Sequence, residues 1–238
     1  MERTLRKGSG MSPASDRSPA PPHGVVACTL RGRRSSDAIE VIVERDGSIN
    51  LVLLDVRAAR DQEALRDRLA ARAHEALAAR EPMHTLAGSL RKIVCEAVAA
   101  SVGVIALRIS LRDERVELLN AGMPAVACVL PDGRLFQLPA LSPDIGPRVE
   151  KAHPYELIPL TPGSRWFVSS DGATEGQEDS SNLWSALGLP GTAHDLAEET
   201  PEGLAERLRI ELGDNLPEDA SVVVIPSTPP PRFESGIV

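Results

Sequence analysis

The chain has 238 residues and a formal net charge of -8, and apolar side chains make up 42% of it. This composition suits a globular protein with a sizeable core, and the acidic balance argues against a nucleic-acid partner, which needs a basic face. Every apolar run is shorter than the roughly 18 residues of a membrane helix, and the N-terminus lacks an apolar signal core, so we expect a cytoplasmic protein with no membrane partner.

The two ends of the chain differ in composition from the rest. Residues 1–23 and 227–238 are rich in Pro and Ser, which predicts a disordered N-terminal arm and a disordered tail. No long linker and no internal repeat interrupts the sequence between them. Residues 24–226 are therefore predicted to form a single domain.

Three strands and two helices are predicted first. The third strand, Ile49–Asp55, is nearly all apolar, which predicts a central strand buried on both faces. Arg45-Asp46-Gly47-Ser48 predicts a hairpin turn before it, because Asp-Gly tolerates positive φ. Apolar residues at helical spacing predict helices at Ala59–Ala79 and Thr85–Ala100, separated by Pro82. The first two strands are Gly24–Arg31 and Asp37–Glu44.

The second half of the chain is dominated by strands. Because runs of strands are separated by a helical pair rather than alternating with helices, the pattern favours an α+β protein with helices covering antiparallel sheets. The remaining predicted strands are Val102–Leu111, Arg115–Asn120, Ala125–Leu130, Leu135–Leu138, Tyr155–Pro159, Arg165–Ser170 and Ala220–Ile225. The remaining predicted helices are Asn182–Leu187 and Pro201–Leu212.

Several acidic residues stand at strand ends: Asp37, Asp55, Asp171, Glu218 and Asp219. A carboxylate at the end of a buried strand is costly unless it is paired or bound to a cation. Carboxylates that converge from distant positions suit hard divalent cations, which prefer oxygen ligands. Any one of them alone is more often a turn former or a helix cap. The three cysteines, by contrast, lie far apart and form no CxxC pair, which favours reduced, buried thiols over a zinc site.

Six short segments, in order along the chain, resemble the SpoIIE-type branch of the metal-dependent (PPM) protein serine/threonine phosphatases. Each segment alone is a weak signal, but their common order and spacing from about Val25 to Ile225 indicate homology. The segments are Ser35-Ser36-Asp37, Leu53-Leu54-Asp55-Val56, Asn120-Ala121-Gly122-Met123-Pro124, Leu160-Thr161-Pro162-Gly163-Ser164-Arg165, Ser169-Ser170-Asp171-Gly172-Ala173-Thr174-Glu175 and Pro217-Glu218-Asp219-Ala220-Ser221.

The resemblance implies a four-layer αββα sandwich and a centre that holds two Mn²⁺ or Mg²⁺ ions. In this family a metal-bound water attacks the phosphorus of a phosphoserine or phosphothreonine. The chain resembles the stand-alone members, whose partner is a phosphorylated regulator protein in sigma-factor or stress-response control. The oligomeric state is left open.

The resemblance also assigns roles by position. Asp37 and Asp55 would bridge the ions, the carbonyl of Val56 would add a ligand, and Asp171 and Glu218 would complete the ligand set of the second ion. Asp37, Asp55 and Asp171 are thus the candidate catalytic residues. Glu218 and Asp219 stay open as alternatives for one ligand. The full set of candidate metal ligands is Asp37, Asp55, Val56, Asp171, Gly172, Glu218 and Asp219.

The chain departs from the family in places that bear on activity. Where the family reads x-Gly-His-Gly after the metal Asp-Val, this chain reads Arg57-Ala58-Ala59-Arg60. Met123 replaces a common His, and Gly103 stands where a Thr is usual. Arg57 and Arg60 are interpreted either as solvated residues at a helix start or as contacts for substrate phosphate. The chain is accordingly either a phosphatase, with reduced activity, or a pseudophosphatase that binds the regulator without turnover.

Overall fold

The computed structural model of the chain describes residues 25–97, 99–147, 153–174, 201–213 and 216–226. The two ends predicted to be disordered and the predicted helix Asn182–Leu187 lie outside these ranges. The strands are β1 (Val26–Leu30), β2 (Asp37–Val43), β3 (Ile49–Arg57), β4 (Ser101–Ser110), β5 (Arg115–Ala121), β6 (Val126–Val129), β7 (Leu135–Leu138), β8 (Glu156–Pro159), β9 (Arg165–Ser169) and β10 (Ala220–Pro226). The helices are α1 (Gln62–Ala78), α2 (Met83–Cys95), the 3-10 helix η1 (Asp171–Ala173) and α4 (Pro201–Leu212).

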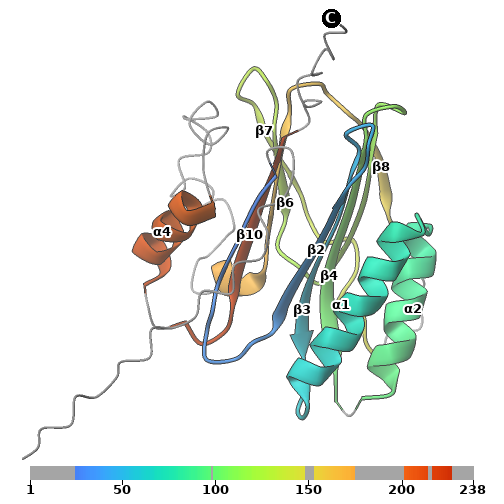
Figure 1. Ribbon diagram of the computed structural model, residues 1–238, viewed down its shortest axis with the longest axis vertical. Coiled ribbons are helices and arrows are strands. Elements are labelled where there is room, and N and C mark those ends of the chain that lie inside the picture. The colour runs from blue at the N-terminus through green and yellow to red at the C-terminus, as the bar shows by residue number, and fades with distance from the viewer. Residues whose placement is uncertain (1–24, 98, 148–152, 175–200, 214–215, 227–238) are drawn as a thin grey trace, which may run out of the picture.

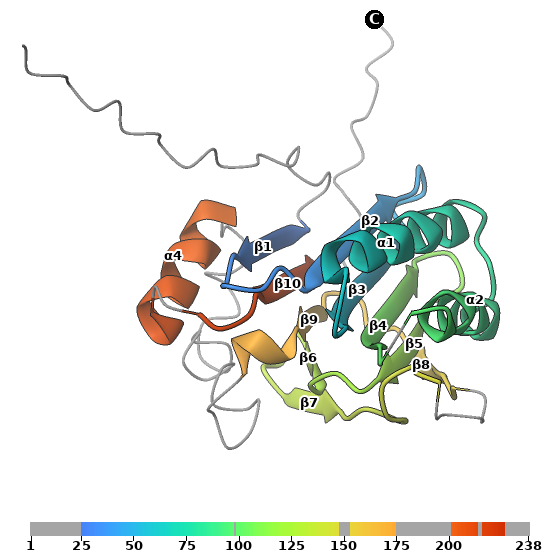
Figure 2. The same ribbon diagram turned by 90° about the horizontal axis from the view of Figure 1, so that it is seen from below.

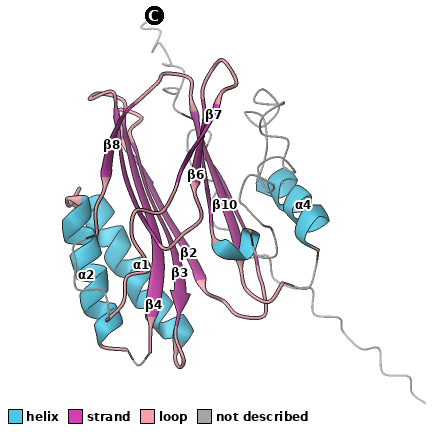
Figure 3. Cartoon of the chain, turned by 180° about the vertical axis from the view of Figure 1, so that it is seen from behind, coloured by secondary structure: helices cyan, strands magenta, loops and turns pink. Residues whose placement is uncertain are grey.

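The strands form two antiparallel sheets of five strands each, which pack face to face. One sheet has the order β1-β10-β9-β6-β7, and the other has the order β2-β3-β4-β5-β8. Figure 1 and Figure 3 show α1 and α2 on the outer face of the second sheet, and α4 beside the outer face of the first. The described residues therefore form four layers, and the predicted α+β, αββα sandwich is confirmed.

Apolar side chains fill each space between neighbouring layers. Alternate residues of β3 enter different clusters, because successive side chains of a strand point to opposite faces. Leu51 and Leu53 join Trp166 in the cluster between the two sheets, whereas Leu54 joins Leu69 in the cluster under α1 and α2. This alternation explains the apolar run in the sequence, since β3 is a central strand that is buried on both faces as predicted.

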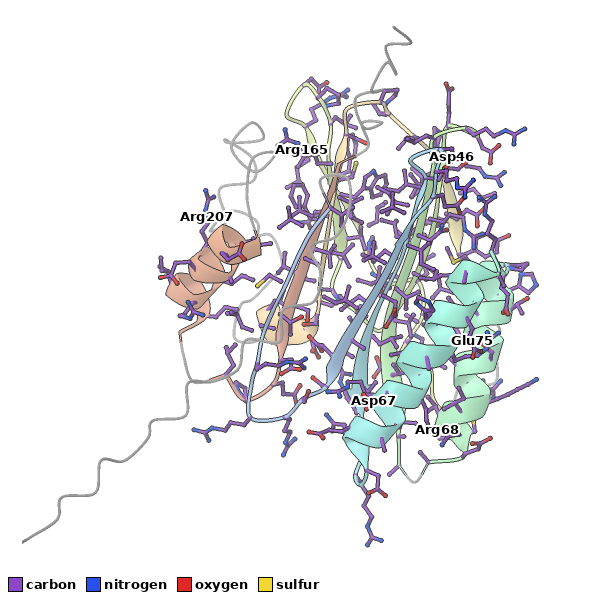
Figure 4. The ribbon with its side chains drawn as sticks, viewed as in Figure 1. Asp46, Asp67, Arg68, Glu75, Arg165 and Arg207 are labelled. Atoms are coloured by element: carbon purple, nitrogen blue, oxygen red, sulfur yellow. The ribbon has the colours of Figure 1, made fainter. Side chains whose placement is uncertain are left out.

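The outer face of α1 is charged. Asp67, Arg68 and Glu75 project away from the sheet in Figure 4, and all three are exposed. The buried side of the same helix carries Leu65 and Leu69, as the spacing predicts. No helix in the described parts of the chain is both long enough and apolar enough to cross a membrane.

Three details of the sequence prediction were wrong. The second helix was expected to run from Thr85 to Ala100, but α2 ends at Cys95. The first helix was expected from Ala59, but β3 continues to Arg57 and α1 begins only at Gln62. The strand extends because Arg57 pairs with Ser101 in the register of β3 with β4. Asp61, just before the helix, adopts a left-handed φ of 52°. The cysteine prediction also holds only in part, since Cys28 and Cys128 are buried but Cys95, at the end of α2, is exposed.

Candidate metal centre

The acidic residues gather at the end of the sandwich where β2 begins and β3 ends, the end that faces the viewer in Figure 2. Asp37 and Asp55 are directly opposite each other across β2 and β3, so the strand register places their side chains on one face. Asp171 follows β9 and Glu218 precedes β10, and both of these strands belong to the opposite sheet. The site is therefore assembled from both sheets.

Three of the carboxylates converge closely. Asp55, Asp171 and Glu218 each offer an oxygen, and these oxygens all lie within 4.8 Å of one another. The side chain of Asp55 is fully buried, whereas those of Asp171 and Glu218 are 39% and 28% exposed. The cluster thus has a buried floor at Asp55 and an open rim that solvent or a ligand can reach.

The buried carboxylates of Asp37 and Asp55, on β2 and β3, have oxygens that accept no hydrogen bond from the described residues. Asp37 accepts a hydrogen bond from Ser36 Oγ at 3.2 Å, but its Oδ2 has no hydrogen-bond partner among the described residues. Burial raises the pKa of Asp37 to about 6. Burial also raises the pKa of Asp55 well above its usual range, and the neighbouring charge of Asp171 adds to the rise. Buried carboxylates of this kind are costly in the charged form, so a cation at this place would stabilise them.

The donor set fits a hard divalent cation. Such ions take oxygen ligands from carboxylates and backbone carbonyls, and the site offers several carboxylates. Val56 and Gly172, predicted as backbone ligands, lie at the same end of the sandwich, directly after Asp55 and Asp171. Val56 is fully buried, and its N–H donates to the carbonyl of Ser36 at 3.0 Å.

Arg57 reaches into this cluster. Positions i and i+2 of a strand share a face, so the extension of β3 points Arg57 to the side of Asp55. Its Nη2 lies 2.8 Å from Asp55 Oδ2, without the alignment of a hydrogen bond, and also pairs with Asp171. Its Nη1 lies 2.7 Å from Asp144 Oδ2. Arg57 is thus engaged with three carboxylates, whereas Arg60 is exposed.

Glu218 and Asp219 lie in different surroundings. The Asp219 carboxylate is fully buried and accepts hydrogen bonds from the Gly32 N–H at 2.9 Å and from Arg31 at 3.0 Å. Ser35 Oγ donates to it as well, at 3.3 Å. Protein donors therefore already occupy both oxygens of Asp219, while Glu218 contributes its oxygen to the convergent cluster. This geometry favours Glu218 over Asp219 as a ligand.

Sequence reasoning missed Asp144. This residue lies between β7 and β8, and its carboxylate accepts a hydrogen bond from Ser101 Oγ at 3.2 Å as well as pairing with Arg57. Its neighbours in the sequence lie outside the six segments that resemble the family, so the only available signal was an acidic residue in a Pro-flanked loop. The contact with Arg57 depends on tertiary packing.

The fold and the site together define a class: a four-layer sandwich with an acidic centre between its sheets, as in PP2C-type phosphatase domains. The sequence profile of the family Stage II sporulation protein E (SpoIIE) matches residues 51–227, and the chain belongs to this family. No curated protein matches the chain in sequence.

Solved structures share the fold at low identity. The SiaA-PP2C domain of Pseudomonas aeruginosa gives a TM-score of 0.69 at 15% identity, over 85% of this chain and 85% of that one. The RsbU and RsbW domains of a Mycobacterium tuberculosis protein give 0.68 at 16% identity, over 87% of this chain and 60% of that one. The PP2C phosphatase domain with a regulatory fragment of the cell fate determinant SpoIIE from Bacillus subtilis gives a TM-score of 0.63 at 15% identity, over 86% of this chain and 62% of that one.

The chain therefore spans less than two thirds of the length of two of these structures, at 60% and 62%. One further structure bears on the ions. The catalytic domain of the serine/threonine protein phosphatase PstP, in complex with two manganese ions, gives a TM-score of 0.59 at 18% identity, over 84% of this chain and 96% of that one.

Proposed function

We propose that the chain is a metal-dependent phosphoserine/phosphothreonine protein phosphatase that acts on a phosphorylated signalling regulator. One observation carries the proposal. Asp37 and Asp55 are buried side by side, Asp37 Oδ2 and both Asp55 oxygens accept no hydrogen bond from the described residues, and Asp171 and Glu218 approach from the opposite sheet. Residues 24–226 are proposed as the single phosphatase domain.

The proposed ligands are those that the resemblance to the family implies, and the convergence of Asp55, Asp171 and Glu218 supports them. Asp37 and Asp55 would hold both ions from one sheet, with the carbonyl of Val56, and Asp171 and Glu218 would hold the second ion from the other sheet. Two bound Mn²⁺ or Mg²⁺ ions would lower the pKa of a bound water and neutralise the charge on the phosphoryl oxygens. The manganese ions of PstP, which has the same fold, support this ligand chemistry.

The chain's own residues then have distinct tasks. Asp55 lies at the buried floor, where the low dielectric strengthens its interaction with a cation. Asp171 and Glu218 lie at the rim, where a phosphorylated side chain of a partner protein has access. Gly172 lets the backbone of η1 approach the segment before β10, since a Cβ at this position would come within 2.1 Å of the Asp219 carbonyl oxygen.

The substrate class is proposed from the relatives. The structures with the same fold include RsbU domains solved together with an RsbW domain and the cell fate determinant SpoIIE. Membership of the SpoIIE family supports a phosphorylated bacterial regulator of sigma-factor or stress-response control as the partner of this chain.

A second candidate is a pseudophosphatase that binds such a regulator without turnover. The position of Arg57 favours it, because this side chain pairs with Asp55 and Asp171, two of the proposed ligands. The loss of the family's Gly-His-Gly loop favours it as well, since Ala58-Ala59-Arg60 offers no His for proton transfer. Positioned proton transfer typically contributes about 10²- to 10⁴-fold in rate.

The experiment is a phosphate-release assay on phosphoserine and phosphothreonine peptides with Mn²⁺. We expect release that requires the ion and that falls by at least about 100-fold in Asp171→Asn, since loss of even an outer-shell partner of a metal site costs about 10- to 100-fold. Asp67→Asn, at an exposed position on α1, is the matched control and should keep full activity. Turnover that is absent in the parent chain would exclude the phosphatase and leave the binding module, whereas turnover that is insensitive to Asp171→Asn would exclude Asp171 as a ligand of the catalytic ions.

A further inference from the structure

Arg57 is the only cationic side chain that pairs with Asp55 or Asp171 among the described residues. Its Nη2 lies 2.8 Å from Asp55 Oδ2 and also contacts the carboxylate of Asp171. Its Nη1 lies 2.7 Å from Asp144 Oδ2. The guanidinium is therefore directed into the acidic centre from the end of β3, and 39% of the side chain remains exposed.

The position of Nη2 conflicts with that of an ion shared by the same two carboxylates. An ion ligated by Asp55 and Asp171 lies within about 2.0–2.6 Å of their oxygens. Nη2 contacts one oxygen of each, so it fills the space between them. Two positive charges at such a separation also repel strongly in a partly buried site. An ion can therefore enter between Asp55 and Asp171 only if Nη2 leaves.

Asp144 gives Arg57 a second place to pair. The Asp144 carboxylate is held independently of Arg57, because it accepts a hydrogen bond from Ser101 Oγ at 3.2 Å. It also packs against Gly122, where a Cβ would come within 1.7 Å of Asp144 Oδ1. The guanidinium can therefore keep its Nη1 pair with Asp144 while Nη2 moves away from the other two carboxylates.

We propose that Arg57 is an internal cation that competes with a divalent metal ion for Asp55 and Asp171, with Asp144 as its anchor. The inference rests on the proposed function, because it assumes that the centre takes divalent ions. Two ions then bind in well-separated steps. The first occupies the side of Asp37 and Asp55, and the second must displace Nη2 and binds more weakly.

The test measures ion binding rather than turnover. The full chain, stripped of metal with a chelator, is titrated with Mn²⁺ by calorimetry, and the EPR spectrum at each stage distinguishes isolated Mn²⁺ from a spin-coupled pair. The variants are Arg57→Gln and Arg57→Lys. Arg60→Gln removes the same charge from an exposed position three residues away and is the matched control.

We expect the second ion to bind at least about tenfold more tightly to Arg57→Gln than to the parent chain, which corresponds to about 1.4 kcal/mol. The EPR spectrum of the spin-coupled Mn²⁺ pair should appear at a correspondingly lower Mn²⁺ concentration in Arg57→Gln. Arg60→Gln should behave as the parent does. Arg57→Lys keeps the charge but cannot span three carboxylates. It should fall between the parent and Arg57→Gln, and it provides the comparison if Arg57→Gln does not fold.

Three results would overturn the competition. If the second Mn²⁺ ion binds with equal affinity to the parent chain and to the Arg57 variants, the competition is overturned, while the proposed metal centre stays intact. If Arg60→Gln raises the affinity for the second ion as much as Arg57→Gln does, the increase is only a general effect of net charge. Absence of Mn²⁺ binding in every variant would remove both the competition and the proposed phosphatase. Binding to Arg57→Gln alone would support the competition and favour the pseudophosphatase for the native chain.

Discussion

Two residues beside the candidate centre, Gly103 and Met123, form a compensating pair. Gly103 lies opposite Asp55 in the register of β3 with β4. A Cβ on Gly103 would come within 2.5 Å of Met123 Sδ and within 3.2 Å of its Cγ. Met123 is 4% exposed and packs in the core between the sheets. Its side chain therefore takes the space that the Thr common in the family would need at position 103. The smaller residue at position 103 thus makes room for Met123.

This pairing predicts that Gly103→Thr destabilises the chain. Overpacking of a filled core costs about 1–3 kcal/mol, because neighbouring side chains or backbone must shift. Restoring the family's pair, Gly103→Thr with Met123→His, should recover part of that loss. The free energy of unfolding, from urea titration, measures both effects.

Gly88→Ala is the matched control for this prediction. No atom lies within 4 Å of a Cβ at Gly88, which is exposed in α2. Alanine in a helix interior is favoured over glycine by about 1 kcal/mol, so this variant should be at least as stable as the parent. If Gly103→Thr were equally stable, the two departures would be independent substitutions.

Among the elements, the connection between β1 and β2 positions the segment that precedes β10. The Arg33 N–H donates to the carbonyl of Leu216 at 3.0 Å, which ties the two segments together. At Gly32 the backbones approach so closely that a Cβ would come within 2.1 Å of the Glu218 carbonyl oxygen. Only glycine permits this approach, and the approach directs Glu218 to the acidic cluster.

We therefore expect Gly32→Ala to weaken Mn²⁺ binding by at least about tenfold, because the segment that carries Glu218 must move, and to lower the free energy of unfolding by about 1–3 kcal/mol. Calorimetric titration and urea unfolding measure the two effects. Gly146→Ala is the control, since the nearest atom to a Cβ there lies at an ordinary 3.5 Å. Unchanged Mn²⁺ affinity in Gly32→Ala would show that the position of Glu218 does not depend on this contact.

The sequence predicted most elements well, because their signals are local. The apolar run of β3 and the Asp-Gly turn before it depend on burial and on positive φ, and Gly47 indeed has a φ of 84°. The resemblance to the family located the acidic residues that the two sheets bring to one end of the sandwich. Their roles as ligands stay a prediction.

Other features escaped prediction because they depend on tertiary structure. Arg57-Ala58-Ala59-Arg60 has good helix propensity, yet pairing with β4 extends β3 to Arg57 and turns its side chain toward Asp55. The choice between Glu218 and Asp219 depends on donors about 185 residues away in the sequence, such as the Gly32 N–H. No local pattern carries that information.

At the scale of the whole molecule, the candidate centre lies between the two sheets. Asp37 and Asp55 come from one sheet, while Asp171 and Glu218 adjoin strands of the other. At this end of the sandwich, the carboxylates from the two sheets meet next to the apolar cluster between the sheets. A cation shared by these residues would therefore link the two halves of the sandwich, and its binding would add to the stability of the whole fold.

This arrangement predicts that Mn²⁺ raises the melting temperature of the full chain. A ligand that binds only the folded state stabilises it by about 2.7 kcal/mol when present at 100 times its dissociation constant, so the rise should continue with Mn²⁺ concentration. Differential scanning calorimetry of the chelator-treated chain over a range of Mn²⁺ measures it. Asp171→Asn, which removes one ligand charge at the rim, should show a clearly smaller rise, whereas Asp67→Asn on the outer face of α1 should match the parent. A melting temperature that does not respond to Mn²⁺ in the parent chain would mean that the carboxylates are held by Arg57 and by hydrogen bonds alone, and the metal centre would have to be abandoned.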